Sequence, residues 1–129
     1  MSIQFSSIRN GSDYSRQYLA QLWNYSSFNA IARGVVTPRG DNKIVLFVTK
    51  NKQESAEQYR NDLIGSKLSW EGPTDHFAEQ RMMNAGPGGD QIHVFYRERH
   101  HMDFTYLGEA RVSNSTLRTD APSSFTFDL

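Results

Sequence analysis

The chain has 129 residues, equal numbers of basic and acidic side chains (14 Lys and Arg, 14 Asp and Glu) and no cysteine. This length predicts one domain with a single core. Zero net charge excludes a histone-like polycation, and the lack of cysteine excludes disulfides, thiolate zinc sites and cysteine nucleophiles. No apolar run approaches the roughly 20 residues of a membrane span, and residues 1–5 do not resemble a signal peptide. We therefore expect a soluble, cytoplasmic domain with no membrane partner.

The N-terminal part predicts an extended segment followed by two short helices. Ile3–Ile8 alternates weakly, as in a first strand or an extended lead-in. Ser12 or Asp13 can cap a helix over Tyr14–Trp23, whose apolar residues recur at helical spacing. A polar break then separates a second short helix, Phe28–Arg33.

The central part changes to the pattern of strands. Val35–Thr37 precedes a turn rich in Pro, Gly, Asp and Asn over Pro38–Asn42. Ile44–Thr49 is an uninterrupted β-branched and aromatic run, which predicts a strand buried on both faces. A polar helix is expected over Glu54–Ile64, and a short strand over Lys67–Glu71.

The C-terminal part predicts one more helix and three strands. The helix spans His76–Ala85, and the strand Ile92–Arg97 pairs naturally with Phe104–Val112. Ser124–Leu129 alternates as a closing edge strand. Five or six strands with three or four short helices predict an α+β fold, with a curved, mostly antiparallel sheet or small β-barrel and short helices outside.

Candidate catalytic groups are few. His100 and His101, with His93 and Asp103 nearby, lack the spacing of a metal site. The serines lie outside any nucleophile-elbow motif, and no glycine-rich phosphate loop follows a strand. We predict that this chain alone has no catalytic residue, metal or cofactor.

Polar side chains stand beside aromatic ones at the expected strand ends. Ser69 and Glu71 flank Trp70, Arg97 follows Tyr96, and the neighbouring strand carries Tyr106. Aromatic rings, a carboxylate and a guanidinium together can hold a planar heterocycle. The alternative is that the aromatic rings fill the core of a small barrel, and that Glu71 is a surface charge facing away from Trp70.

Charge is unevenly distributed along the chain. Residues 1–60 carry eight basic and four acidic side chains, whereas residues 61–129 carry six basic and ten acidic ones. One face could therefore meet phosphates, unless the two halves interleave and their charges mix. The phosphate-binding residues that we predict are Arg33, Arg39, Lys43 and Lys50, with Arg16 joining from the first helix.

Several segments between Tyr14 and Val112 resemble a domain family of uncharacterised function. That family occurs at the C-termini of modification-dependent (type IV) restriction enzymes with helicase or phospholipase D-type modules, and related domains are joined to HNH nucleases. The similar segments are Tyr14–Pro38, Ile44–Thr49 (IVLFVT), a polar helix with Tyr59, Leu68–Glu71 (LSWE), Ile92–Arg97 (IHVFYR) and Phe104–Ala110 (FTYLGEA).

The resemblance implies that residues 1–129 form a single modified-DNA-reading domain within a longer restriction enzyme. Such a domain would bind double-stranded DNA containing 5-methyl- or 5-hydroxymethylcytosine, flip the base into an aromatic pocket, and direct a separate nuclease or helicase. By analogy its architecture would be SRA-like or PUA/EVE-like. The alternatives are a protein-interaction module that docks such a nuclease or helicase without DNA affinity, and a small-molecule or nucleotide enzyme.

Within that interpretation each pocket residue has an expected role. Trp70 with Tyr96 or Tyr106 would form the planar walls. Glu71 or Asp103 would accept a hydrogen bond from the cytosine amino group. Arg97 would donate to the base carbonyl or fill the gap left by the base, and Ser69 would contact the C5 substituent.

Overall fold

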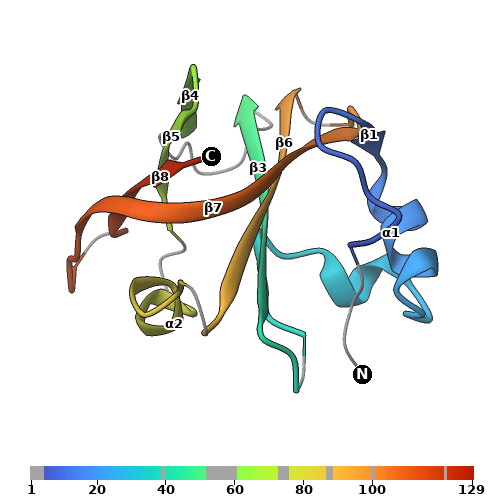
Figure 1. Cartoon of the computed structure of the whole chain (residues 1–129), viewed down its shortest axis with the longest axis horizontal. Helices are drawn as coiled ribbons and strands as arrows, with labels where there is room; N and C mark the ends of the chain where they lie inside the picture. Colours follow the sequence, from blue (N-terminus) through green and yellow to red (C-terminus); the bar gives the residue numbers. More distant parts are fainter. Residues whose placement is uncertain are drawn as a thin grey trace.

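The structure is a computed structural model that describes residues 5–38, 40–51, 61–72, 76–86, 89–99, 101–120 and 122–129. Strands dominate these residues, and the helices are short (Figure 1). The elements in chain order are β1 (Asp13–Tyr14), α1 (Arg16–Leu22), the 3-10 helix η1 (Phe28–Ile31), β2 (Val35–Val36), β3 (Lys43–Asn51), β4 (Asn61–Ile64), β5 (Lys67–Glu71), α2 (Glu79–Met83), β6 (Gln91–Arg99), β7 (Phe104–Thr116) and β8 (Ser124–Asp128).

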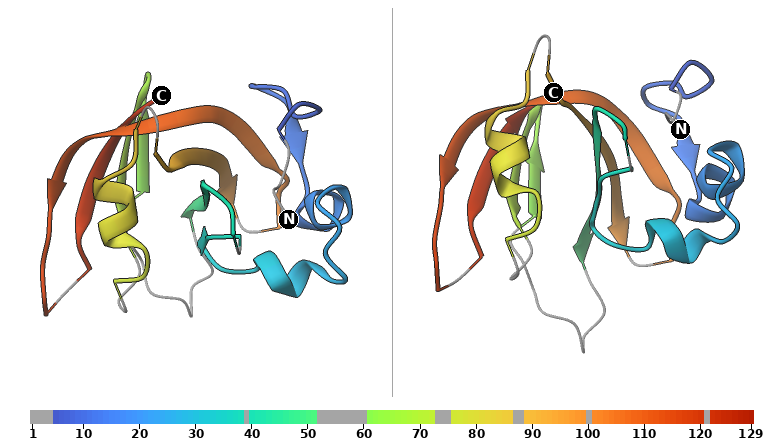
Figure 2. Two further views of the ribbon diagram at one scale, coloured as in Figure 1. Left: turned by 60° about the horizontal axis from the view of Figure 1, so that its bottom comes forward. Right: turned by 90° about the horizontal axis from the view of Figure 1, so that it is seen from below.

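The strands form one mixed sheet in the order β2-β3-β6-β7-β8-β5-β4, and β1 pairs with the start of β7. The long strand β7 belongs to both halves, because it pairs with β6 along its first part and with β8 along its second. In both views of Figure 2 it arches from the side of α1 to the side of β5 and β8. The β8-β5-β4 half therefore curls around one face of the β3-β6 half.

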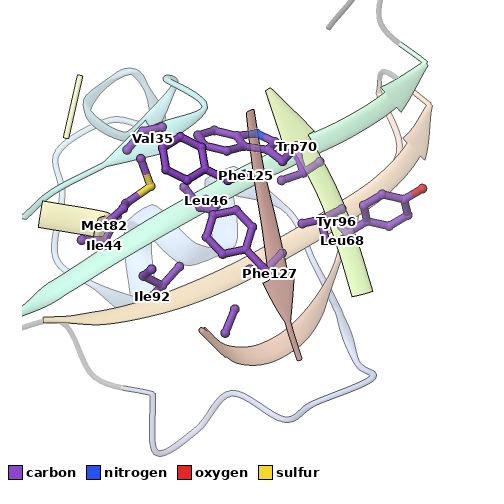
Figure 3. Packing of buried hydrophobic residues seen from close by; sticks show 13 residues of the cluster. Val35, Ile44, Leu46, Leu68, Trp70, Met82, Ile92, Tyr96, Phe125 and Phe127 are labelled. Carbon is purple, nitrogen blue, oxygen red and sulfur yellow. The ribbon is translucent and has the colours of Figure 1, made fainter. Parts of the chain in front are cut away.

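A core fills the inside of this curl, and we call the face of β3 and β6 that lines it the inner face. Alternate residues of both strands point into this core, where they meet α2 and the inward residues of β5 and β8 (Figure 3). Its fully buried residues include Leu46, Leu68, Met82, Val94 and Phe127. This packing holds the two halves of the sheet together.

A second core lies on the opposite, outer face of β3 and β6. Here Val45, Phe47 and Phe95 pack against the N-terminal segment and against Leu19 and Ile31 of the two N-terminal helices. The helix α1 begins where the Ser15 side chain accepts a hydrogen bond from the amide of Tyr18, which satisfies one of the free amides of the first turn. The N-terminal segment thus covers the outer face, and β3 and β6 are buried on both faces as their sequence predicts.

The expected α+β fold is confirmed, with a mostly antiparallel curved sheet and short helices outside. The sheet stays open instead of closing into a barrel, because the path ends at β2 and β4. One pair, β3 with β6, is parallel. The prediction that Ser124–Leu129 forms an edge strand is wrong, because β8 lies inside the sheet, between β7 and β5.

The expected helix over Glu54–Ile64 is wrong where it can be compared. Residues 52–60 lie outside the described part, and residues 61–64 form β4. Gly65, the residue that follows the expected helix, forms a two-residue hairpin turn together with Ser66, between the paired residues Ile64 and Lys67. Its φ of +60° suits such a turn.

Local hydrogen bonding also changes the N-terminal boundaries. Residues 5–8 of the expected first strand form a turn closed by the bond from the Ile8 amide to the Phe5 carbonyl. Tyr14 is not part of the helix, because it belongs to β1 and pairs with Phe104 of β7. The N-cap of the helix is therefore Ser15, in place of Ser12 or Asp13. The second helix is a 3-10 helix, and α2 covers only five of the residues expected between His76 and Ala85.

Candidate nucleic-acid interface

The parallel strands β3 and β6 end side by side, and we call this end the carboxyl-end edge. Val48 pairs with Tyr96 and Thr49 with Arg97 in the register of the two strands. Because successive strand residues point to opposite faces, Tyr96 points to the inner face and Arg97 to the outer face. The predicted site residues Tyr96 and Arg97 therefore lie at one edge of the sheet but on different sides of it.

Trp70 and Tyr96 both belong to the inner core. Each residue is 6% exposed, and the Trp70 ring lies 5.7 Å from Phe125 and 5.8 Å from Phe127. In Figure 3 the hydroxyl of Tyr96 points away from the centre of the cluster. The structure thus brings two of the expected aromatic walls into one core, with the polar end of Tyr96 at its margin.

Two carboxylates influence the Tyr96 hydroxyl electrostatically. Burial, followed by the negative charges of Glu98 and Asp62, raises the pKa of Tyr96. Asp62 comes from β4, where it pairs with Ser69 of β5. Sequence reasoning missed Asp62, because the segment that contains it, Glu54–Ile64, was assigned to a polar helix. The Tyr96 hydroxyl at the margin of the inner core is therefore under the influence of carboxylates from two strands.

Three other predicted pocket residues lie elsewhere. Ser69 and Glu71 are half-buried on the face of β5 opposite Leu68 and Trp70. Asp103 is exposed in the turn between β6 and β7. The structure therefore does not bring the expected carboxylates, Glu71 and Asp103, against the Trp70 ring.

Tyr106 lies on the outer face, in a network with His93. Its hydroxyl is 2.7 Å from His93 Nδ1, and His93 Nε2 is 3.2 Å from Gln91 Oε1. The Phe5 ring stacks on the imidazole with a centroid separation of 3.9 Å. Burial and then the Glu109 charge raise the pKa of Tyr106 to about 12. Tyr106 therefore does not share a pocket with Trp70 and Tyr96.

The predicted phosphate-binding residues are spread over the molecule. Lys50 is exposed at the carboxyl-end edge, and Arg33 is exposed just before β2, with its guanidinium 4.4 Å from the centre of the Phe77 ring. Phe77 and Arg33 also line a hollow of about 300 Å³ beside β2. Lys43 lies at the opposite end of β3 from Lys50, and Arg39 lies outside the described residues.

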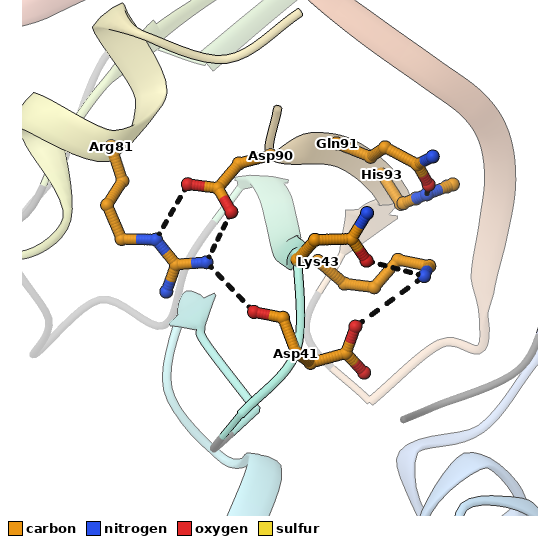
Figure 4. Close-up of polar contacts among 7 residues, drawn as sticks. Asp41, Lys43, Arg81, Asp90, Gln91 and His93 are labelled. Carbon is orange, nitrogen blue, oxygen red and sulfur yellow. Dashed lines mark hydrogen bonds and ion pairs between the residues drawn. The ribbon is translucent and has the colours of Figure 1, made fainter. Parts of the chain in front are cut away.

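Lys43 belongs to a polar cluster at the amino ends of β3 and β6 (Figure 4). Its ammonium lies 3.5 Å from an Asp41 carboxylate oxygen and donates to Asn42 Oδ1 at 3.0 Å. Arg81 of α2 donates to both carboxylate oxygens of Asp90 at 2.9 and 3.0 Å, and to the Asp41 carbonyl at 3.3 Å. This cluster ties α2 to the main sheet, so its charges are already partnered.

Arg16 and Arg97 approach each other on the outer face. Arg16 Nε donates to the Ile31 carbonyl at 3.0 Å, and Arg97 Nε donates to Thr49 Oγ1 at 2.8 Å. Burial, and then the positive charge of Arg97, lowers the pKa of Arg16 to about 10. Both side chains therefore remain cationic near neutral pH.

Metal-binding and membrane-spanning features were sought in the same residues. Over the described ranges, no group of three or more His, Cys, Asp or Glu residues could hold a metal ion. In that part of the chain, no helix combines the length and the apolar character needed to cross a bilayer.

Similarity to known proteins identifies the fold and the family of the chain. The SRA domain of SUVH5, solved in complex with hemimethylated CG DNA, superposes with a TM-score of 0.67 over 99% of this chain and 92% of that chain, at 11% sequence identity. The chain therefore has an SRA-like fold. No curated protein sequence is significantly similar to the chain. A family model described as a domain of unknown function, DUF3427, matches residues 8–126, and the chain therefore belongs to the DUF3427 family.

Proposed function

We propose that this domain binds double-stranded DNA containing a modified cytosine, 5-methyl- or 5-hydroxymethylcytosine. The observation that carries the proposal is the SRA-like fold over nearly the whole chain, shared with a domain crystallised on hemimethylated DNA. We further propose that the domain is not itself an enzyme and that it directs a nuclease or helicase module.

The margin of the inner core supplies a chemical rationale for base recognition. The cytosine amino group donates hydrogen bonds, and carboxylates are suited to accept them. The negative charges of Glu98 and Asp62 act on the Tyr96 hydroxyl, which lies at the margin of a core that contains Trp70. A base flipped from the duplex could stack and pair there, at the margin of the core instead of deep within it.

The binding proposal is tested with three duplexes of the same sequence, carrying unmodified, 5-methyl- or 5-hydroxymethylcytosine at one CG step. Fluorescence anisotropy should show about 5- to 150-fold tighter binding to one modified duplex, since a discriminating base contact contributes about 1–3 kcal/mol. Equal affinity for all three duplexes would contradict modified-base reading. No binding to any of them would favour a protein-interaction module.

Conservative amide variants locate the amino-group acceptor. Asp62→Asn should weaken binding to the modified duplex, because it replaces an acceptor oxygen with a donor. Glu71→Gln and Asp103→Asn test the acceptors expected from the sequence in the same way, and Asp128→Asn on β8 is the matched control. If only the control and Asp62→Asn retain the parent affinity for the modified duplex, the acceptor is Glu71 or Asp103.

The non-catalytic proposal has its own assay. The isolated chain, incubated with Mg²⁺ and the modified duplex, should leave the DNA intact on a denaturing gel. Cleavage that follows the protein through purification would overturn this part of the proposal.

A further inference from the structure

Two arginines from distant parts of the chain converge on one aromatic ring of the outer face. The guanidinium carbon of Arg97, near the end of β6, lies 4.2 Å from the centre of the Phe104 ring. That of Arg16, the first residue of α1, lies 5.1 Å from the same ring and 4.7 Å from the Phe47 ring. The aromatic rings thus hold two cationic groups together at the carboxyl-end edge.

Both guanidiniums are held by neutral acceptors. Each Nε donates to a buried residue, Ile31 for Arg16 and Thr49 for Arg97. Each also donates from a terminal nitrogen to the carbonyl of an exposed residue, Arg33 at 3.4 Å and Met102 at 3.3 Å. A guanidinium has five N–H groups, so both retain donors beyond these bonds.

Among the described residues, no carboxylate pairs with Arg16 or Arg97, in contrast to Arg81, another half-buried arginine. Arg81 is bound through two nitrogens by the Asp90 carboxylate, whereas neither Arg16 nor Arg97 forms an ion pair with any residue in the described ranges. Burial lowers the pKa of both groups, and the charge of Arg97 lowers that of Arg16 further. Bringing two like charges together with partial burial is unfavourable without a counter-ion.

We propose that Arg16 and Arg97 together bind one backbone phosphate of the DNA duplex. A phosphate oxyanion would offset both the mutual repulsion and the loss of solvent, and it matches the planar fork of a guanidinium. The site rests on the proposed function, because it is the DNA backbone that supplies the phosphate. Its position supports that source, since Arg97 lies at the same carboxyl-end edge as Tyr96, on the opposite face of the sheet.

Backbone contact predicts a specific pattern of binding losses. Arg16→Gln and Arg97→Gln should each weaken binding to modified and unmodified duplexes alike, by about tenfold, and lower the salt slope of the affinity by about one. Arg97→Lys should weaken binding less, because it keeps the charge but loses the fork. The matched control is Arg111→Gln, an exposed arginine seven residues along β7 from Phe104, or about 23 Å away.

Anisotropy titrations over a range of salt concentrations, with thermal melting of each variant, provide the test. Parent-like affinity in folded Arg16→Gln and Arg97→Gln would overturn the phosphate site while leaving modified-DNA binding intact. A loss confined to the modified duplex would also overturn it, because that outcome indicates a base contact.

Inorganic phosphate separates this site from the proposed function. If the parent protein binds no duplex, the Nε–H NMR signals of Arg16 and Arg97 should still shift on adding phosphate at constant ionic strength. In the Arg97→Lys variant the Arg16 Nε–H signal should shift less. Unchanged signals in the parent would overturn the anion site itself.

Discussion

His93 is a buried histidine that the fold keeps neutral. It is 5% exposed, its two ring nitrogens face the Tyr106 hydroxyl and the Gln91 side chain, and Phe5 covers one side of the ring. Burial, and then the positive charge of Lys43, lowers the pKa of His93 to about 4, against a weaker opposing effect of Asp41. The neutral ring is therefore part of the folded outer core.

Stability should fall on acidification as a consequence. Below the ordinary histidine pKa of 6.5, His93 becomes protonated in the unfolded chain, whereas in the folded chain it stays neutral down to about pH 4. The free energy of unfolding should therefore decrease as pH falls through this range, by at most about 3 kcal/mol. Urea unfolding at several pH values measures the loss.

The control for this prediction is His93→Gln, which keeps polar groups but cannot titrate. The variant should be less stable near neutral pH, and its stability should depend less on pH between 6.5 and 4. Parallel pH profiles for the parent and the variant would show that His93 is not responsible for the acid sensitivity.

The candidate site was only partly predictable at the level of residues. Strand alternation alone indicates that Trp70 and Glu71 point to opposite faces, and the structure has this arrangement. Sequence spacing could not show that Arg16 meets Arg97, because that contact depends on α1 folding over the outer face. Nor could it show that Asp62 approaches Tyr96, since that depends on the curl of the sheet.

A bulge in β7 positions the N-terminal segment. Val94 pairs with Gly108 and Phe95 with Tyr106, so Leu107 is an extra residue on β7. Asn10 donates to the Leu107 carbonyl at 3.3 Å, and the Gly11 amide donates to the Tyr106 carbonyl at 2.8 Å. The irregularity thus frees backbone groups of β7 for the turn that precedes β1.

Gly108 is required at this bulge for two reasons. Its φ is +97°, and a Cβ there would lie 2.7 Å from Asn10 Nδ2. Gly108→Ala should therefore lower the free energy of unfolding by about 2–3 kcal/mol through backbone strain and crowding. Urea unfolding measures the loss.

A double-mutant cycle separates the two contributions. Asn10→Ala removes the crowded group at the cost of one hydrogen bond, so the double variant should be more stable than the sum of the single losses implies. Strict additivity would contradict crowding by Asn10 and leave only the backbone strain of Gly108.

Elements with a strong local pattern were predicted well, and elements made by pairing were not. The runs around Ile44–Thr49 and Ile92–Arg97 are apolar enough to indicate buried strands whatever their partners. The strands β1, β2 and β4 have only two to four residues, too few for periodicity to show. They exist because a neighbouring strand supplies their hydrogen bonds, which a local pattern does not encode.

Across the whole molecule, the sheet connects two cores that share β3 and β6. The fold class followed from the order of strong strands and short helices. The parallel pairing of β3 with β6 did not, because more than forty residues separate the paired positions. The internal position of β8 also depends on β7 being long enough to reach it. These long-range choices put Tyr96 and Arg97 beside Val48 and Thr49 of β3 at one edge, which no local signal indicates.

The number of cations that can reach the DNA backbone determines how strongly binding depends on salt. The exposed cations near the carboxyl-end edge, Arg33 and Lys50, with the Arg16–Arg97 pair, would make about three phosphate contacts. The logarithm of the affinity should then fall against the logarithm of salt concentration with a slope near −2.7, or about 40-fold between about 50 and about 200 mM salt.

Charge reversal at Lys50 and Arg33 tests this count on an unmodified duplex. The double variant should lower the magnitude of the slope by about two, because two phosphate contacts are lost. Lys67→Glu is the control, since its ammonium already pairs with Asp128 at 2.6 Å on another strand pair. A parent-like slope in the double variant would show that the duplex lies across a different face, and a flat parent slope would exclude backbone binding and favour a protein partner.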